Sequence, residues 1–298
     1  KILYSILVML AVMSCGKSYD EQKRLSRAER ARLLKEDSLA LKIAVLPTID
    51  CLPLYVAKEH LMYDTAQVDL RLRCFTAQMD QDTALAGRSV EGVVSDIVRM
   101  EHMRREGTCV EYLTRTNAYW QLITNYKARV KNPGQLGDKM VAMTRNSATD
   151  YLTDRVLDGV KTSSIVFRIQ VNDVNVRLAM LLNNEMDAMW LTEPQATTAR
   201  IYGNKVIADS RDLNARLGVI AFRAEVMRNE RRKKQVEAFV KAYNMACDSL
   251  NERGIKAYAE VARKYYKMDP KTLGSLPKLK FYHVEKPSQK EIDIINKK

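Results

Sequence analysis

Residues 42–60, which read KIAVLPTIDCLPLYVAKEH, are the stretch of this chain that most restricts its fold. They begin with a short apolar run at 43–46, of the kind found in parallel strands that are covered on both faces. A proline then stands near the first position of a helix, where its missing N–H costs nothing. Leu54, Ala57 and Leu61 follow at helical spacing. The pattern predicts a buried strand, a polar turn, and a helix whose apolar face packs back on the sheet.

The polar turn after this strand is a candidate ligand site. In open parallel sheets, ligands bind beyond the carboxyl ends of the strands. Thr48, Asp50 and Cys51 occupy that position in the predicted unit. The alternative is a plain strand, turn and helix that contacts no ligand. We expect these turn residues to contact a solute.

Strands and helices alternate along the rest of the chain in two similar blocks. The predicted strands are 68–75, 92–97, 109–114, 119–124, 139–144, 165–171, 187–191, 205–208 and 216–222. The predicted helices include 78–86, 98–105, 174–184, 237–250 and 255–266, and one that begins near residue 147. This alternation predicts an α/β fold of two lobes, joined by two crossing segments that act as a hinge around a cleft.

The amino terminus has the features of a targeting segment. Lys1 precedes an apolar run at 2–13 that is too short to span a bilayer. The run ends in VMSCG, which resembles the signal of bacterial lipoproteins. The resemblance implies that residues 1–14 are a removed signal peptide, that Cys15 is lipidated, and that residues 15–40 form a charged, partly helical spacer. The alternative is a buried first strand with a chance cysteine.

Charge and cysteine usage exclude several classes of function. The net charge of +13 comes from scattered basic residues, with clusters at 23–32 and 228–234 that are interleaved with Glu, and no aromatic and basic stacking motif accompanies them. We therefore expect no nucleic-acid partner. His60, His102 and His283 are far apart and no Cys-x-x-Cys occurs, so we expect neither a metal site nor a cofactor. The cysteines other than Cys15 allow three disulfide pairings, and no spacing selects one.

Four stretches resemble a known family: 52–59 (LPLYVAKE), 84–96, 147–152 and 187–194. They are similar to the periplasmic solute-binding proteins of ABC importers, in the branch that serves nitrate, sulfonates, taurine and thiamine-pyrimidine precursors. The resemblance covers about residues 41–209. The chain departs from the family pattern at His60-Leu61-Met62, around Glu91, and at Asn146, where glycine is frequent. These departures weaken the transfer of any particular ligand.

The resemblance implies a type II periplasmic-binding-protein fold with a ligand cleft between two lobes. Each lobe would be a mostly parallel sheet flanked by helices. Lobe 1 would comprise residues 41–116 and 217–298, and lobe 2 residues 117–216. The lobes would close on the solute. We expect a monomer whose partners are a small-molecule solute and a membrane permease.

Candidate ligand contacts follow from strand ends and helix starts. Ser147 and Thr149 stand at a helix start, where backbone N–H groups favour an acceptor or an anion. Asp50 and Asp96 end two strands of the first lobe, where each either contacts ligand or caps the next helix. The full set of predicted contacts is Thr48, Asp50, Cys51, Asp96, Asn117, Ser147, Thr149, Trp190 and Glu193.

The predicted site carries more carboxylates than cations. The carboxylates are Asp50, Asp96, Asp150 and Glu193, and the nearest cations are Arg99 and Arg145. This balance favours a solute that donates hydrogen bonds, such as an amino-substituted heterocycle, over a bare oxyanion.

The sequence therefore predicts a lipid-anchored, extracytoplasmic protein, on the periplasmic side or the cell surface, that delivers a small organic solute to an ABC importer without catalysing a reaction. One alternative is an enzyme on the same fold, related to pyrimidine-precursor synthases or menaquinone-pathway enzymes. The chain has no CCCFC-type motif, no Ser-His-Asp order and no phosphate loop to support it. A ligand sensor or an adhesin is the other alternative.

Overall fold

The computed structural model describes residues 27–296, and the chain divides into two units, Lys1–Ala40 and Leu41–Lys298. The described part of the first unit is helix α3 (Arg27–Leu39), which lies within the predicted spacer and carries an ion pair between Arg32 and Glu36 at 3.6 Å. The predicted signal peptide and Cys15 lie outside the described residues. Between residues 27 and 296, no helix combines the length and the apolar character needed to cross a membrane.

The second unit contains a first sheet of five strands in the order β2-β1-β3-β10-β4. The strands are β1 (Leu41–Val45), β2 (Leu70–Cys74), β3 (Gly92–Asp96), β4 (Val110–Arg115) and β10 (Gly218–Arg223). Strand β1 pairs in parallel with β2 and β3, whereas β10 is antiparallel to both β3 and β4. We call this sheet and its helices lobe 1.

The second sheet repeats this plan in the order β7-β6-β8-β5-β9. Its strands are β5 (Gln121–Thr124), β6 (Met140–Met143), β7 (Phe167–Gln170), β8 (Ala188–Leu191) and β9 (Lys205–Asp209). Strand β6 is parallel to β7 and β8, and β5 is antiparallel to β8 and β9. We call this part lobe 2. In each sheet the one antiparallel strand, β10 or β5, is the first strand after the chain crosses from the other lobe. The predicted two-lobed, mostly parallel α/β architecture is confirmed.

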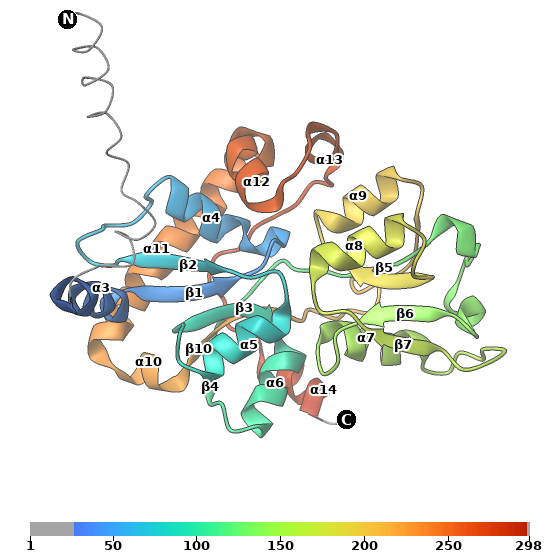
Figure 1. The fold of residues 1–298 in the computed structure, drawn as a ribbon, viewed down its shortest axis with the longest axis horizontal. Coiled ribbons are helices and arrows are strands. Elements are labelled where there is room, and N and C mark those ends of the chain that lie inside the picture. Colours follow the sequence, from blue (N-terminus) through green and yellow to red (C-terminus); the bar gives the residue numbers. More distant parts are fainter. Residues whose placement is uncertain (1–26, 297–298) are drawn as a thin grey trace, which may run out of the picture. The chain divides into compact units, whose positions relative to one another are not determined.

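Helices flank both sheets (Figure 1). Lobe 1 has α4 (Leu52–Glu59), α5 (Gln78–Ala86), α6 (Ile97–Arg105), α10 (Ala224–Arg228), α11 (Glu230–Arg253), α12 (Ala259–Tyr266), α13 (Pro270–Ser275) and α14 (Gln289–Asn296). Lobe 2 has α7 (Ala148–Leu157), α8 (Val174–Leu182) and α9 (Gln195–Ile201). Short 3-10 turns lie at Ile49–Cys51, Tyr126–Ala128, Pro133–Leu136 and Ile255–Tyr258.

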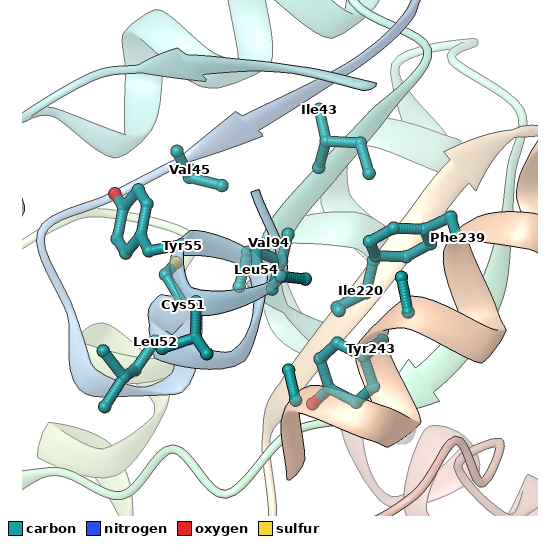
Figure 2. Packing of buried hydrophobic residues seen from close by; sticks show 14 of the residues in the cluster. Ile43, Val45, Cys51, Leu52, Leu54, Tyr55, Val94, Ile220, Phe239 and Tyr243 are labelled. Carbon is teal, nitrogen blue, oxygen red and sulfur yellow. The ribbon is translucent and has the colours of Figure 1, made fainter. Parts of the chain in front are cut away.

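The largest core of lobe 1 lies where α4 and α11 cover one face of the first sheet. Figure 2 shows Ile43 and Val45 of β1 facing side chains of both helices, including Leu54 and Phe239. Tyr55 is buried in this core, and its hydroxyl donates to the carbonyl oxygen of Leu46 at 2.9 Å, so this hydroxyl has a partner there. Apolar burial of this kind is the main favourable contribution to folding.

One expectation about a helix is wrong in detail. Leu61 does not belong to the packed face of α4, because the helix ends at Glu59 and Leu61 adopts a left-handed conformation with φ of 47° and is exposed. Helix α11 begins at Glu230, and Asn229 caps it by accepting from the N–H of Arg232 at 3.0 Å.

Candidate functional site

A cavity of about 50 Å³ lies between the two lobes. Side chains from strand ends and helix starts of both sheets line it: Leu46, Thr48, Asp50, Gln78, Val94, Ser95, Asp96, Ala118, Trp120, Thr149, Val174, Arg177, Trp190, Leu191, Thr192 and Gln195. At about 12 Å³ for each water-sized probe, this volume corresponds to about four water molecules. A larger solute therefore requires the lobes to separate or the side chains to move.

The lobes contact each other on two sides of this cavity. On one side, the N–H of Ile49 donates to the carbonyl oxygen of Glu193 at 2.8 Å, and Gln195 Nε2 donates to the carbonyl oxygen of Pro47 at 2.8 Å. On the other side, Arg99 Nη1 donates to the carbonyl oxygen of Arg145 at 3.0 Å. These bonds across the cleft define a closed arrangement of the lobes.

Asp96 links the two lobes through a single carboxylate. Its Oδ1 accepts from the N–H of Arg99 in α6 at 2.8 Å and from the N–H of Ala148 in α7 at 3.0 Å. Its Oδ2 accepts from Gln78 Nε2 at 2.7 Å. Burial raises the pKa of Asp96, and these three donors oppose that shift because they favour the ionised form. Asp96 therefore caps one helix in each lobe.

Asp50 is the second carboxylate of the cavity. It is buried, and its Oδ2 accepts from the hydroxyl of Thr116 at 3.1 Å. Burial raises the pKa of Asp50, while hydrogen bonds from Thr48 and Thr116 act in the opposite direction. Its other neighbours at the cavity are Thr48 and Leu46.

Three buried polar atoms of the lining residues have no hydrogen-bond partner within residues 27–296. They are Arg177 Nε, Thr192 Oγ1 and Gln195 Oε1. The other nitrogens of Arg177 do have partners: Nη1 donates to the carbonyl oxygen of Trp190 at 3.1 Å and Nη2 to Thr144 Oγ1 at 3.4 Å. Burial lowers the pKa of Arg177 to about 10. Because buried polar groups are nearly always paired, three unpaired atoms on residues that line one cavity make it the candidate binding site.

Sequence reasoning missed these three residues. A signal for Arg177 existed, because it stands four residues before Leu181 on a mostly apolar helix and so on the face that packs inward. Thr192 and Gln195 flank Glu193, which the strand-end argument did select. Gln78 of α5 was also missed.

Five of the predicted contacts line the cavity: Thr48, Asp50, Asp96, Thr149 and Trp190. Trp190 is fully buried, and its Nε1 donates to Thr153 Oγ1 at 2.9 Å, so most of the indole belongs to the lobe 2 core. Thr149 Oγ1 accepts from the N–H of Thr144 at 2.9 Å. Contact of these residues with a solute stays a prediction.

The other four predicted contacts do not line the cavity. Cys51 is fully buried in the apolar core of lobe 1 (Figure 2). Asn117 Nδ2 donates to the carbonyl oxygen of Lys280 at 3.0 Å. Ser147 caps α7, and its hydroxyl donates to the carbonyl oxygen of Thr144 at 2.7 Å. Glu193 is fully buried and accepts from the hydroxyl of Tyr119 at 2.8 Å and from Arg200 Nη2 at 2.7 Å.

The charges at the cavity differ from those that the sequence indicated. Arg99 pairs with Asp82, Arg145 is exposed, and Asp150 pairs with Arg168 at 3.1 Å. The charged residues that line the cavity are Asp50, Asp96 and Arg177. Carboxylates still outnumber cations: Asp50 and Asp96 remain from the predicted carboxylates, and Arg177 replaces the predicted cations.

The described part of the chain contains four cysteines. Cys51, Cys74, Cys109 and Cys247 are all free thiols. Among residues 27–296, no three His, Cys, Asp or Glu side chains gather where they could hold a metal ion. The described residues that line the cavity include no His, Cys or Lys.

Neither the protein-family models nor the curated proteins include a match to this sequence. Solved structures do match. The alkanesulfonate-binding protein SsuA from Xanthomonas axonopodis pv. citri, bound to MOPS, has a TM-score of 0.73 at 17% identity and covers 87% of this chain and 90% of that chain. The ligand-binding component of an ABC-type import system from Staphylococcus aureus, with zinc bound, has a TM-score of 0.69 at 19% identity, with 87% and 91% covered. This chain has the type II periplasmic-binding-protein fold.

The nitrate-binding protein NrtA from Synechocystis PCC 6803 has the same fold, with a TM-score of 0.65 at 16% identity and coverage of 79% of this chain and 69% of that chain. The fold that the sequence predicted is thus confirmed. The backbone conformation at Asn146 accounts for one departure from the family pattern. It has a φ of 54°, a left-handed conformation that asparagine and glycine both tolerate.

Proposed function

We propose that this chain is an extracytoplasmic solute-binding protein that captures a small organic solute between its lobes and delivers it to an ABC importer. The observation that carries this proposal is the closed cavity with three unpartnered polar atoms, Arg177 Nε, Thr192 Oγ1 and Gln195 Oε1. The periplasmic-binding-protein fold and the binding proteins among the similar structures support it.

The remaining parts of the proposal rest on the sequence. Residues 1–14 would be a signal peptide, Cys15 a lipid anchor and residues 15–40 a spacer. Residues 41–116 and 217–298 would form one rigid body and residues 117–216 the other, with a monomer as the working form. Closing would be driven by solute that binds the closed arrangement more tightly than the open one.

The cavity favours a binding role over catalysis. Its lining offers two carboxylates, one guanidinium and hydroxyl and amide groups, and Asp96 is already held by three donors. No described lining residue is a histidine or cysteine that could form a nucleophile and base pair. An enzyme on this fold is therefore the weaker alternative.

Native mass spectrometry of the full chain, purified in detergent, would identify a co-purified solute. We expect calorimetry with that solute to show one site per chain. If no member of a broad panel of small organic solutes bound to the protein, that result would contradict the proposed function.

Replacing Arg177 tests whether the cavity is the binding site. Arg177→Met removes the Nε donor, and a hydrogen bond from a charged group contributes about 1.5–3 kcal/mol, so affinity should fall about 10- to 100-fold. The matched control is Arg168→Met, because Arg168 lies in the same lobe but pairs with Asp150 and Asp154 outside the cavity. Equal affinity of the two variants would show that the solute binds elsewhere.

A further inference from the structure

The amino terminus of α7 faces the cleft, and its backbone donors are already occupied. The N–H of Ala148 donates to Asp96 Oδ1 at 3.0 Å, and the N–H of Thr149 donates to Ser147 Oγ at 3.2 Å. The N–H groups of Asp150 and Tyr151 both donate to the carbonyl oxygen of Ser147, at 3.1 and 3.0 Å. A helix start ordinarily attracts anions through such N–H groups. In this chain each of these four N–H groups of α7 already has an acceptor, so none of them remains for an anion.

The group that fills this position comes from the opposite lobe. Asp96 ends β3 of lobe 1, and its carboxylate reaches the first N–H of α7 in lobe 2. The same oxygen accepts from the N–H of Arg99, so the carboxyl group of Asp96 lies between two helix starts. Gln78 Nε2, on Oδ2, fixes the orientation of the carboxylate. Asp96 therefore takes the place that a carboxylate, sulfonate or nitrate ligand would need.

We propose that Asp96 determines specificity by occupying the anion position at the start of α7, so that the protein rejects oxyanions and selects an uncharged or cationic solute. This inference rests on the proposed function, whose solute class it narrows. An oxyanion in the cavity would face the acceptor oxygens of both Asp96 and Asp50, against the single guanidinium of Arg177.

The unpartnered atoms indicate what the selected solute must offer. Arg177 Nε needs an acceptor, Gln195 Oε1 needs a donor, and Thr192 Oγ1 can take either role. Asp50 offers a further acceptor at the same cavity. The solute class is thus a small molecule that carries both hydrogen-bond donors and acceptors, of the amide or amidine type, with no negative charge. Trp120, Trp190 and Val174 add apolar contact surface.

The test removes the carboxylate and measures binding of oxyanions. Asp96→Ser keeps a good cap for α6, since serine is favoured at that position, but its side chain is too short to reach across to Ala148. We expect the full-length Asp96→Ser protein to bind nitrate or methanesulfonate at least about tenfold more tightly than the wild type, as measured by calorimetry. The control is Asp150→Ser. It removes one negative charge from α7 at a residue that does not line the cavity, and it should leave anion binding unchanged.

Two outcomes would overturn the inference. One is a folded Asp96→Ser protein that gains no affinity for nitrate, sulfate or methanesulfonate. The other is a wild-type protein that itself binds nitrate, sulfate or methanesulfonate in calorimetry, and this measurement does not depend on whether the variant folds. Both titrations use simple anions, so they can be read without knowing the natural solute. If no organic solute bound to the wild-type protein, that result would contradict the proposed function and not the inference about Asp96.

Discussion

Asp82 of α5 is the carboxyl group whose burial should leave a measurable trace in the stability of the protein. Its Oδ2 accepts from Arg99 Nε, while Oδ1 has no hydrogen-bond partner in the described part of the chain. Burial raises the pKa of Asp82 to about 6 from an ordinary value of 3.8, against the opposing effect of Arg99 and with a further increase from Asp96. The folded state therefore binds this proton more tightly than the unfolded state does.

The stability contributed by neutral Asp82 should be present below about pH 3.8 and be lost as the pH rises through about 6. The full change amounts to about 3 kcal/mol, at 1.36 kcal/mol per pKa unit. In Asp82→Asn, the free energy of unfolding should fall less between pH 4 and pH 7 than in the wild type, as urea denaturation would measure. Asp80→Asn, an exposed change on the same helix, should keep the wild-type difference. An unchanged pH dependence in Asp82→Asn would contradict the raised pKa.

Single residues of the site were predictable where a local rule applied to them. Thr48, Asp50 and Asp96 follow buried strands, and the strand-end rule alone brings them to the cavity. Arg177 was not predictable in the same way, because periodicity tells which face of α8 is buried but not that the buried face meets a cleft. Glu193 shows the converse. It also stands at a strand end, yet Tyr119 and Arg200 hold it inside lobe 2.

Gly218 lies where the crossing segments leave no room for a side chain. It begins β10, and a Cβ there would lie 2.3 Å from Thr116 Oγ1 and 2.6 Å from Ala118 Cβ. Forcing atoms into a packed site costs about 1–3 kcal/mol, so Gly218→Ala should lower the free energy of unfolding by that amount. Gly274→Ala in α13 meets nothing within 4 Å and should not destabilise the protein. Equal thermal stability of the two variants would show that the crossing segments adjust freely.

Helices and strands were largely predictable because their signals are local. The predicted helix at 78–86 matches α5 (Gln78–Ala86), and Gly87 is its C-cap. Strand β2 lies at the edge of its sheet, as its alternating pattern indicated. Leu61 shows where a local signal fails, because helical spacing from Leu54 and Ala57 does not reveal that α4 ends at Glu59.

The closed arrangement of the two lobes can be tested with a reversible cross-link. Thr198 of α9 in lobe 2 and Thr272 of α13 in lobe 1 place their Oγ1 atoms 3.2 Å apart. Thr198→Cys combined with Thr272→Cys should form a disulfide, because the side chains already approach within bonding reach. We expect release of a bound solute from the oxidised protein to be at least about tenfold slower, since the lobes must separate for exchange.

Reduction should restore the wild-type release rate. The measurement is best made with Cys74 and Cys109, the exposed thiols of the described residues, replaced by serine so that they do not compete with the new pair. The single Thr198→Cys variant is the control for the substitution itself. If the oxidised double variant released solute as fast as its reduced form, exchange would not require separation of α9 from α13.

The position of the two tryptophans has a practical consequence. The chain contains only Trp120 and Trp190, and both line the cavity, one from the segment that crosses between the lobes and one from the end of β8. All of the indole fluorescence of the protein therefore originates from residues that line the cavity. Occupancy and lobe movement can be followed by emission from the unmodified chain, without a dye or a label.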